Sequence, residues 1–358
     1  MTEAKFDAKK ELEDLILTVI REDGSDLHMA ANRVPYIRVI GELVPLVKKA
    51  PLTQENMLEF ASLMLTDDRK EKLFKEYEVD FSYSYGNKAR FRCNAFFQRG
   101  ILSVAMRLIP EYIRNVEELN LPPILETFAR KKQGFFLVVG PIGQGKSTTL
   151  AALVQLINAE RTEHILTIED PVEYLFRPVK SIIDQREIHT DTMDFHSGLY
   201  SMFRQDVDVV MIGEMRDHET MSVAVTAAET GHLVFSTLHT NDATQTIDRI
   251  IDTFPPEQQN QIGAQLAESL LGVFSQRLIP RISGGQIPAY ELLINTNAVS
   301  NLIRERRSHE IPRVIETGAE FGMIDFNRSL AELVHNGEIT PENAALFSTN
   351  AKSLERLL

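Results

Sequence analysis

The first hundred residues place apolar side chains at two different periods. Near the N-terminus they recur at helical spacing, which predicts a helix with one buried stripe. The stripe consists of Leu12, Leu15, Ile16, Val19 and Ile20. Thr53 precedes a second helical pattern and is expected to cap it. Residues 36–46 form two short apolar runs typical of a hairpin, and residues 79–109 alternate as antiparallel strands do, with a Gly-Asn turn at 86–87. Residues 1–109 are therefore expected to form a small α+β domain.

The pattern changes beyond this domain. The stretch IPEYIRNVEELNLPP holds three prolines and little periodicity, which predicts a linker at residues 110–122. From there on, apolar runs alternate with helical patterns, as in a mostly parallel sheet with helices on its faces. The runs are Phe135–Val139, Ile165–Ile168, Val209–Ile212 and Leu233–Phe235. After about residue 255 the pattern is mainly helical, so residues 123–358 are expected to form an α/β domain with a helical C-terminal region.

Composition narrows the classes of protein that fit. The 358 residues include 51 acidic and 38 basic side chains, a net charge of -13, which argues against a nucleic-acid coat but leaves a local basic channel open. Cys93 is the single cysteine, so no disulfide within the chain and no multi-cysteine zinc site is possible. The N-terminus is charged, so we expect no signal peptide. No uninterrupted apolar run reaches ~18 residues, so we expect no membrane-spanning helix. We expect any membrane association to go through a partner.

A glycine-rich loop follows the first apolar run. Residues 140–147, GPIGQGKS, match G-x-x-x-x-G-K-[ST] in full, between an expected strand and an expected helix. Glycines let successive backbone N–H groups turn inward and cradle phosphate oxygens, and the helix adds its positive dipole end. Lys146 is expected to reach the β- and γ-phosphates of ATP, and Ser147 to place its hydroxyl on Mg²⁺. The expected nucleotide-binding residues are Gly140, Pro141, Ile142, Gly143, Gln144, Gly145, Lys146, Ser147 and Thr148.

Carboxylates follow two later apolar runs. Glu169, Asp170 and Glu173 come after the second run, and a carboxylate near a γ-phosphate can orient and deprotonate the attacking water. Glu214 comes after the third run, where such enzymes keep an acidic residue for Mg²⁺. The alternative for each is a solvated acidic turn at the end of a strand.

Two histidines bracket the last apolar run. His232 precedes it and His239 follows it. Beside the other polar groups at strand ends, they are candidate sensors of the γ-phosphate. A histidine is more often a structural hydrogen-bonding residue, and this alternative stays open.

Together these motifs resemble those of the secretion-type ATPases that drive type IV pili and type II secretion. ILTIEDPVEY is similar to the aspartate box of that family, RQDVDVVMIGEMRD to its Walker B segment and AAETGHLVFSTLHTNDA to its histidine box. GSDLHMAANRVPYIRVIGEL and NLIRERRSHEIPRVI extend the likeness to nearly the whole chain. Within the family the chain resembles the PilT/PilU-type pilus retraction ATPases, since assembly ATPases carry an extra N-terminal domain and many have a four-cysteine zinc insertion.

The resemblance implies a RecA-like P-loop ATPase core preceded by a PAS-like α+β domain. It matches Glu173 with the catalytic base and Glu214 with the Walker B glutamate that serves the metal. It also matches Lys146 with the P-loop lysine, and His232 and His239 with the histidine-box pair.

Three arginines match residues of the family's N-terminal domain that reach a nucleotide on the same or a neighbouring subunit. They are Arg92, Arg99 and Arg107. Arginine suits this role because it is always charged and can fork onto phosphate oxygens. Arg99 lies one residue earlier than in many PilT sequences, as in PilU, and Ser300 replaces an arginine of the C-terminal motif, so the choice between the two subtypes stays open.

The function that the resemblance implies is a homohexameric motor. It would hydrolyse ATP with Mg²⁺ in the cytoplasm, at the face of the inner membrane, and power pilus retraction and twitching motility. Its partners would be the PilC-like inner-membrane platform protein and a paralogous retraction ATPase, with no nucleic acid. Hydrolysis would change the angle between the two domains at residues 110–122. Two alternatives stay open: a regulatory or structural ring subunit that hydrolyses ATP weakly, and a DNA-translocating RecA-like ATPase, which the acidic charge disfavours.

Overall fold

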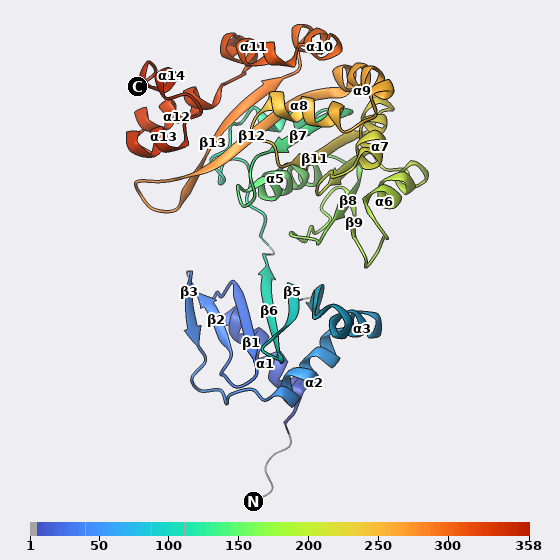
Figure 1. Ribbon diagram of the computed structural model, residues 1–358, viewed down its shortest axis with the longest axis vertical. Coiled ribbons are helices and arrows are strands. Elements are labelled where there is room, and N and C mark those ends of the chain that lie inside the picture. The colour runs from blue at the N-terminus through green and yellow to red at the C-terminus, as the bar shows by residue number, and fades with distance from the viewer. Residues whose placement is uncertain (1–5, 40, 87, 111) are drawn as a thin grey trace, which may run out of the picture. The chain divides into compact units, whose positions relative to one another are not determined.

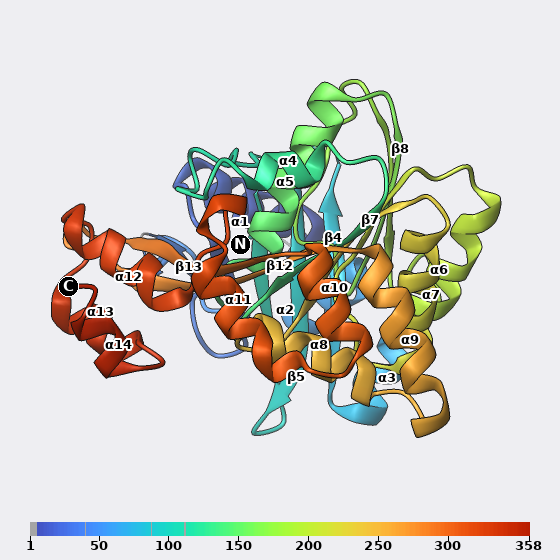
Figure 2. The ribbon, with the colours of Figure 1, turned by 90° about the horizontal axis from the view of Figure 1, so that it is seen from above.

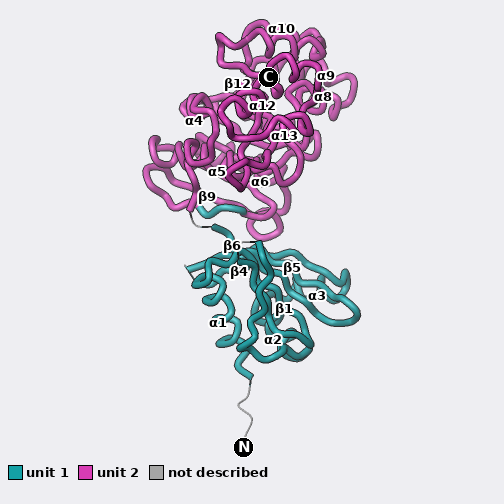
Figure 3. The backbone as a smooth tube through the Cα atoms, turned by 90° about the vertical axis from the view of Figure 1, so that its left-hand side faces the viewer, with its two compact units in different colours: residues 1–111, 173–175 teal, residues 112–172, 176–358 magenta. Residues whose placement is uncertain are grey.

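The computed structural model describes residues 6–39, 41–86, 88–110 and 112–358, and divides into two compact units (Figure 3). Unit 1 spans the chain up to residue 111 together with residues 173–175, and unit 2 comprises residues 112–172 and 176–358. Asn87, half of the expected turn at 86–87, lies outside the described residues. Within the described part of the chain, no helix is long and apolar enough to cross a membrane.

Unit 1 is an antiparallel sheet with helices packed against it (Figure 1). The strands run in the order β3-β2-β1-β6-β5-β4, and each neighbouring pair is antiparallel. They are β1 (Asp26–Ala30), β2 (Tyr36–Val39), β3 (Glu42–Pro45), β4 (Glu78–Tyr85), β5 (Ala89–Gln98) and β6 (Ile101–Ile109). The helices are α1 (Ala8–Arg21), α2 (Gln54–Met64) and α3 (Asp67–Glu76).

Two local predictions for unit 1 can be compared with its helices. Four residues of the expected stripe on α1 are buried, whereas Ile20 is 38% exposed and lies outside the stripe. Thr53 caps α2 as expected: its side chain accepts a hydrogen bond from the Asn56 N–H, and the Asn56 side chain accepts one from the Thr53 N–H. This reciprocal pair satisfies two of the donors that a helix start leaves without a partner.

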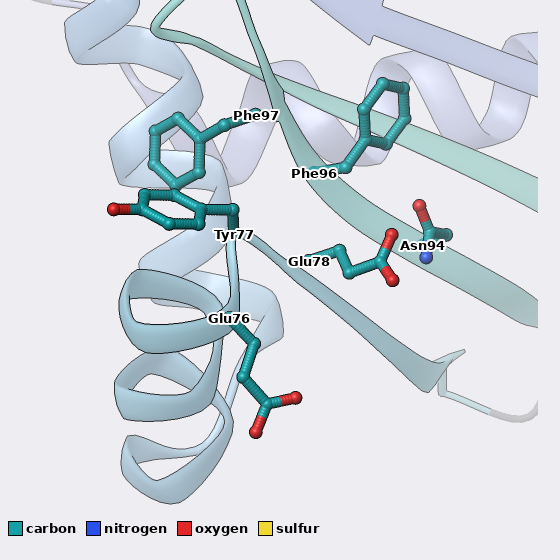
Figure 4. A pocket seen from close by; sticks show the side chains of 6 residues that line it. All are labelled: Glu76, Tyr77, Glu78, Asn94, Phe96 and Phe97. Carbon is teal, nitrogen blue, oxygen red and sulfur yellow. The ribbon is translucent and has the colours of Figure 1, made fainter.

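A shallow hollow marks the place where α3 meets the edge strand β4 (Figure 4). Its lining consists of Glu76, Tyr77, Glu78, Asn94, Phe96 and Phe97. Tyr77 ends α3 in the left-handed conformation (φ 66°), and its ring meets that of Phe97 edge-on at 6.4 Å between centroids. Because Tyr77 is 68% exposed, this aromatic contact belongs to the surface of unit 1 rather than to its core.

Unit 2 is built on a mostly parallel sheet with strand order β13-β12-β7-β11-β10-β8-β9. Among the strand pairs that the structure describes in this sheet, only β12–β13 is antiparallel. The strands are β7 (Gly134–Val139), β8 (His164–Glu169), β9 (Ile182–Glu187), β10 (Val209–Ile212), β11 (Leu233–Leu238), β12 (Leu270–Pro280) and β13 (Gln286–Ile294). The carboxyl ends of β7, β11, β10 and β8 therefore lie side by side at one edge of the sheet.

Helices cover both faces of this sheet (Figure 2). On one face α4 and α5 pack, with Phe128 of α4 stacked on Phe136 of β7 at 4.3 Å. The other face buries Phe135, Leu137 and Val139 in the main core, together with apolar residues of α6 to α11. The helices are α4 (Leu125–Ala129), α5 (Lys146–Glu160), α6 (Phe195–Ser201), α7 (His218–Glu229), α8 (Ala243–Asp252), α9 (Pro256–Ser269), α10 (Asn297–Arg304) and α11 (Ile311–Thr317).

The expectation of a mainly helical region after residue 255 is wrong for residues 270–294. They form β12 and the edge strand β13. β12 lies inside the sheet and is largely buried on both faces, so its sequence lacks the alternation of a half-buried strand. The prediction holds from residue 297 onward. There α12 (Phe326–His335), α13 (Pro341–Phe347) and α14 (Ala351–Glu355) bury a small core of their own with the outer ends of β12 and β13.

Candidate functional site

The glycine-rich loop joins β7 to α5, as the sequence predicts. Gly145 is the N-cap of α5 and has φ 79°, and Lys146 is the first helical residue. Gly140 has φ 145°, and a Cβ there would overlap the backbone carbonyl oxygen of Gln276 on β12. Only glycine fits this position, since both its backbone angle and its neighbour exclude a side chain.

Lys146 is buried beneath the loop. Its Nζ donates hydrogen bonds to the backbone carbonyls of Gly140 and Pro141, both at 2.8 Å, and lies 3.3 Å from Nδ1 of His239. The lysine is 7% exposed, so its charge is compensated by oxygens and an imidazole nitrogen of the protein.

Glu214 follows β10 at the same edge of the sheet. Its carboxylate forms an ion pair with Arg216, and its Oε2 lies 3.4 Å from Nε2 of His239. The hydrogen bond to Glu214 raises the pKa of the Arg216 guanidinium above its ordinary value. His239, which follows β11, therefore contacts Lys146 through one ring nitrogen and Glu214 through the other.

Side chains of β11 fix the backbone that carries Glu214. The Thr237 hydroxyl donates to the carbonyl of Gly213 at 2.6 Å, and the Ser236 hydroxyl donates to that of Ile212 at 3.0 Å. Both hydroxyls are buried within the sheet. They hold the turn after β10 against the strand that leads to His239.

Glu169 ends β8 and is 5% exposed. Its Oε1 accepts hydrogen bonds from the Thr167 hydroxyl at 2.6 Å and from the Gln185 amide at 3.2 Å. These contacts bind the carboxylate to β8 and β9.

The structure divides the remaining predicted residues between the two units. Glu173 groups with unit 1, where its Oε1 lies 3.9 Å from a guanidinium nitrogen of Arg92. Arg92 on β5 and Arg107 on β6 are direct cross-strand partners, and Arg107 also donates to Asp26 at 2.8 Å. Arg99 lies instead in the tight turn between these strands, with φ 51°. Arg92 and Arg107 are thus brought together, and Arg99 is not.

His232 is also set apart from its expected partner. It precedes β11, whereas His239 follows it, and a strand of that length rises roughly 20 Å. The His232 Nδ1 lies 3.0 Å from the carbonyl oxygen of Ala227, and its ring meets that of Phe203 edge-on at 5.6 Å. Within unit 2, His239 joins the P-loop and His232 lies at the opposite edge of the sheet.

Ser147 and Glu214 are the expected metal ligands. The described residues contain no group of three or more His, Cys, Asp or Glu side chains that could hold a metal by themselves. A serine hydroxyl and one carboxylate nevertheless suit Mg²⁺, which usually keeps several waters and binds through one or two protein oxygens plus substrate phosphates. Ser147 and Thr148 are half-buried in the first turn of α5, whereas Ile142 at the loop tip is 83% exposed.

Sequence reasoning missed the contribution of β12 to this site. Gln276 is 2% exposed; its Nε2 donates to the Gln144 carbonyl of the P-loop, and its Oε1 accepts from the Thr149 hydroxyl of α5. The Gln144 side chain in turn accepts a hydrogen bond from the Leu278 N–H at 2.7 Å. The polar residues Ser275, Gln276 and Arg277 within the otherwise apolar run LLGVFSQRLI were the available signal. Arg216, which pairs with Glu214, was also missed.

Comparisons with known proteins identify the family of the chain. The family model described as type II/IV secretion system protein matches residues 7–319. The chain is 42% identical over 335 residues to the type IV pilus retraction ATPase PilT of Pseudomonas aeruginosa, covering 93% of this chain and 97% of PilT. It is 38% identical over 349 residues to the type IV pilus ATPase PilU of the same organism, covering 97% and 91%.

A solved structure shows the same fold. The crystal structure of the pilus retraction motor PilT with bound ADP matches with a TM-score of 0.89 and 41% identity, covering 96% of this chain and 98% of that chain. Like that protein, the chain combines an antiparallel α+β unit with a mostly parallel α/β unit. The chain therefore belongs to the family of type II/IV secretion system proteins.

Proposed function

We propose that this protein is a P-loop ATPase that powers type IV pilus retraction. The observation that carries the proposal is the contact chain Lys146–His239–Glu214, which gathers a buried cation, an imidazole and a carboxylate at the carboxyl edge of a parallel sheet. Open α/β sheets place their ligands at this edge. The similarity to PilT, a retraction ATPase by name and an ADP-binding protein in its crystal structure, supports both the reaction and the biological role.

The P-loop is proposed to bind the phosphates of ATP. Lys146 now donates to the carbonyls of Gly140 and Pro141, and phosphate oxygens would take over as its acceptors. The exchange replaces neutral acceptors with charged ones, which form stronger hydrogen bonds with an ammonium group. The N-terminus of α5 adds its backbone N–H groups and the positive end of its dipole.

Ser147 and Glu214 are proposed to hold Mg²⁺ beside these phosphates. When bound, the ion would neutralise negative charge on the phosphate oxygens. His239 contacts both Glu214 and Lys146 and would hold the two side chains in fixed positions relative to each other.

Glu173 is proposed as the group that orients and deprotonates the attacking water. Glu169, at the end of β8, is proposed as a second catalytic carboxylate. Arg92, Arg107 and Arg99 are proposed to absorb charge on the transferred phosphoryl group, as fixed cations do in phosphoryl transfer. The cross-strand pairing of Arg92 with Arg107, and the 3.9 Å ion pair of Arg92 with Glu173, favour a joint role for these three residues in unit 1. Arg99 and His232 have no such neighbour among the site residues, and their roles rest on the resemblance alone.

The wider assembly is proposed from the family. Six copies would form a ring of RecA-like cores, each with a PAS-like N-terminal unit, at the cytoplasmic face of the inner membrane. ATP turnover would change the angle between the units about residues 110–122 and move a PilC-like platform protein, so that pilin returns to the membrane. A paralogous retraction ATPase is a proposed second partner.

Steady-state hydrolysis of Mg-ATP tests the enzyme. Lys146→Ala is expected to lower turnover at least about a hundredfold, because one cation of the transition state is lost. Lys352→Ala, which removes an exposed lysine of α14, is the matched control and should leave turnover unchanged. If the wild type were no faster than Lys146→Ala, the chain would be a non-hydrolysing ring subunit. Stimulation of turnover by duplex DNA would point to a translocase instead.

A cell-based measurement tests the biological role separately. Cells that lack the protein are expected to keep surface pili and to lose twitching, and Lys146→Ala should fail to restore it where Lys352→Ala succeeds. Restoration by Lys146→Ala would separate the pilus function from ATP hydrolysis and overturn the motor.

A further inference from the structure

Gln276 of strand β12 contacts the P-loop and the helix after it at three places. The carbonyl of Gln276 lies against Gly140, where no side chain fits. The Gln276 side chain donates from Nε2 to the carbonyl of Gln144 at 2.5 Å and accepts at Oε1 from the Thr149 hydroxyl at 2.7 Å. Gln276 therefore contacts the loop at Gly140 and Gln144 and the helix after the loop at Thr149.

The partners of Gln276 determine how its amide is oriented. The Gln144 carbonyl can only accept, so Nε2 must face it. Oε1 then faces the Thr149 hydroxyl, which donates. Gln276 and Thr149 are each 2% exposed, and buried polar groups that lose such partners are costly. A glutamine at this position is therefore specified by hydrogen bonding, and an apolar side chain of the same size could not replace it.

The hydrogen bond to Gln144 also fixes a backbone amide. The peptide bond between Gln144 and Gly145 is trans, so its carbonyl and its N–H point in opposite directions. Because the carbonyl is held toward Gln276, the Gly145 N–H is directed away from β12. An N–H group at this point of the loop, directly before α5, is one of those that cradle phosphate oxygens in a P-loop.

The Gln144 side chain strengthens the same attachment from the loop. β12 continues to Pro280, past its last pairing with β7 between Ser275 and Val139. Beyond that pairing, Gln144 Oε1 accepts the N–H of Leu278 at 2.7 Å. The P-loop therefore provides a hydrogen-bond partner for β12 beyond the end of its pairing with β7. Gln276 binds the backbone of the loop, and Gln144 binds the backbone of β12.

From these contacts we propose that Gln276 is a positioning residue for nucleotide binding. It holds the 144–145 peptide so that the Gly145 N–H is presented to phosphate before the nucleotide arrives. The inference rests on the proposed function, because it assigns a role to Gln276 in binding the nucleotide of that same site.

The test compares Gln276→Met and Gln276→Glu with a control on the same strand. The first variant keeps the volume and removes both hydrogen bonds, whereas the second keeps an acceptor for Thr149 and turns an acceptor toward the Gln144 carbonyl. Both are expected to weaken Mg-ADP binding by calorimetry, and to raise KM for ATP, about tenfold or more, with kcat at saturation changed less than about threefold. Val273→Ala truncates a fully buried residue of β12 and should lower Tm while leaving KM and the Kd of Mg-ADP unchanged.

Several outcomes would overturn the proposal. It fails if the Gln276 variants bind Mg-ADP as the wild type does, or if Val273→Ala weakens binding as much as they do. Wild-type protein in the same assays separates this failure from that of the proposed function, since a wild type that neither binds nor hydrolyses nucleotide would refute both. Should both Gln276 variants fail to fold, Gln144→Ala removes the Leu278 contact from the loop, and a severalfold rise in Kd is expected; unchanged binding would again overturn the proposal.

Discussion

His239 accepts a hydrogen bond from Lys146 across 3.3 Å, and this contact sets the roles of its two ring nitrogens. The lysine ammonium can only donate, so Nδ1 must carry a lone pair and the ring proton must sit on Nε2. That nitrogen lies 3.4 Å from the Glu214 carboxylate, which accepts. His239 thus separates the cation that would serve the phosphates from the carboxylate that would serve the metal.

His239→Ala is expected to weaken Mg-ADP binding and to lower kcat/KM for ATP by about tenfold to a hundredfold, because Lys146 and Glu214 lose the group that contacts both and holds them in position. His232→Ala is the matched control. Its imidazole contacts the Ala227 carbonyl at the opposite edge of the sheet, so Mg-ADP affinity should stay unchanged. Steady-state kinetics and calorimetry on both variants make the comparison. Equal losses of nucleotide affinity in the two variants would contradict the division seen within unit 2.

The sequence was most informative where structure depends on neighbouring residues. The P-loop, its flanking strand and helix and the Thr53 cap all rest on contacts within a few positions, and the structure confirms them. The placement of His239 followed from the rule that parallel strands deliver side chains to one edge. The same rule separates His232, because the strand between the two histidines carries them to opposite edges, although the family motif groups them.

Long-range contacts were not predictable in this way. Gln276 reaches its two partners across 132 and 127 residues, and no local pattern indicates which distant loop a buried amide will meet. The sequence of β12 predicts part of a helical region, because the burial of the strand on both faces removes the alternation that marks a half-buried strand. Without that strand in place, its attachment to the P-loop could not be anticipated.

Gly140→Ala is expected to destabilise the protein by about 2–4 kcal/mol and to abolish nucleotide binding. The new methyl group would require an unfavourable φ and would overlap the backbone of Gln276, which cannot move without shifting β12. Gly143→Ala is the control: it also has a positive φ, 76°, but nothing lies within 4 Å of its Cβ position. Its cost should stay near ~1 kcal/mol. Thermal unfolding and Mg-ADP calorimetry measure both, and equal losses of stability would contradict the steric argument.

Thr53→Ala is expected to cost about 1 kcal/mol of stability, because the N-terminus of α2 loses its reciprocal side-chain cap. Thr66 occupies the corresponding position before α3, but its side chain makes no capping hydrogen bond. Thr66→Ala should therefore cost only a few tenths of a kcal/mol. Both threonines lie in unit 1, so urea unfolding of the two variants reports on the same unit. A Thr66 variant as unstable as the Thr53 variant would show that the residue type matters more than the cap.

Glu291 gives the fold a pH dependence of unusual sign. Burial raises the pKa of this β13 carboxyl from 4.5 to about 7, further supported by the charges of Asp242 and Asp325 and opposed by a hydrogen bond from the Ala243 N–H and by Arg277. A raised pKa means that the folded state binds the proton more tightly than the unfolded state. The contribution of Glu291 to stability is therefore fully present below pH 4.5 and is lost as the pH rises through about 7. The loss amounts to about 3 kcal/mol, since one pKa unit corresponds to ~1.4 kcal/mol.

Glu291→Gln removes the titration while keeping an acceptor for the Ala243 N–H at the start of α8. The variant is expected to be more stable than the wild type at about pH 8.5, where the wild type must bury an ionised carboxylate, and to lose most of that advantage at about pH 5.5. The difference between the two unfolding free energies cancels the titration of all other groups, so urea denaturation of both proteins at the two pH values isolates Glu291. If the difference in unfolding free energy between the two proteins stayed constant with pH, the buried Glu291 carboxyl would keep one protonation state in this range.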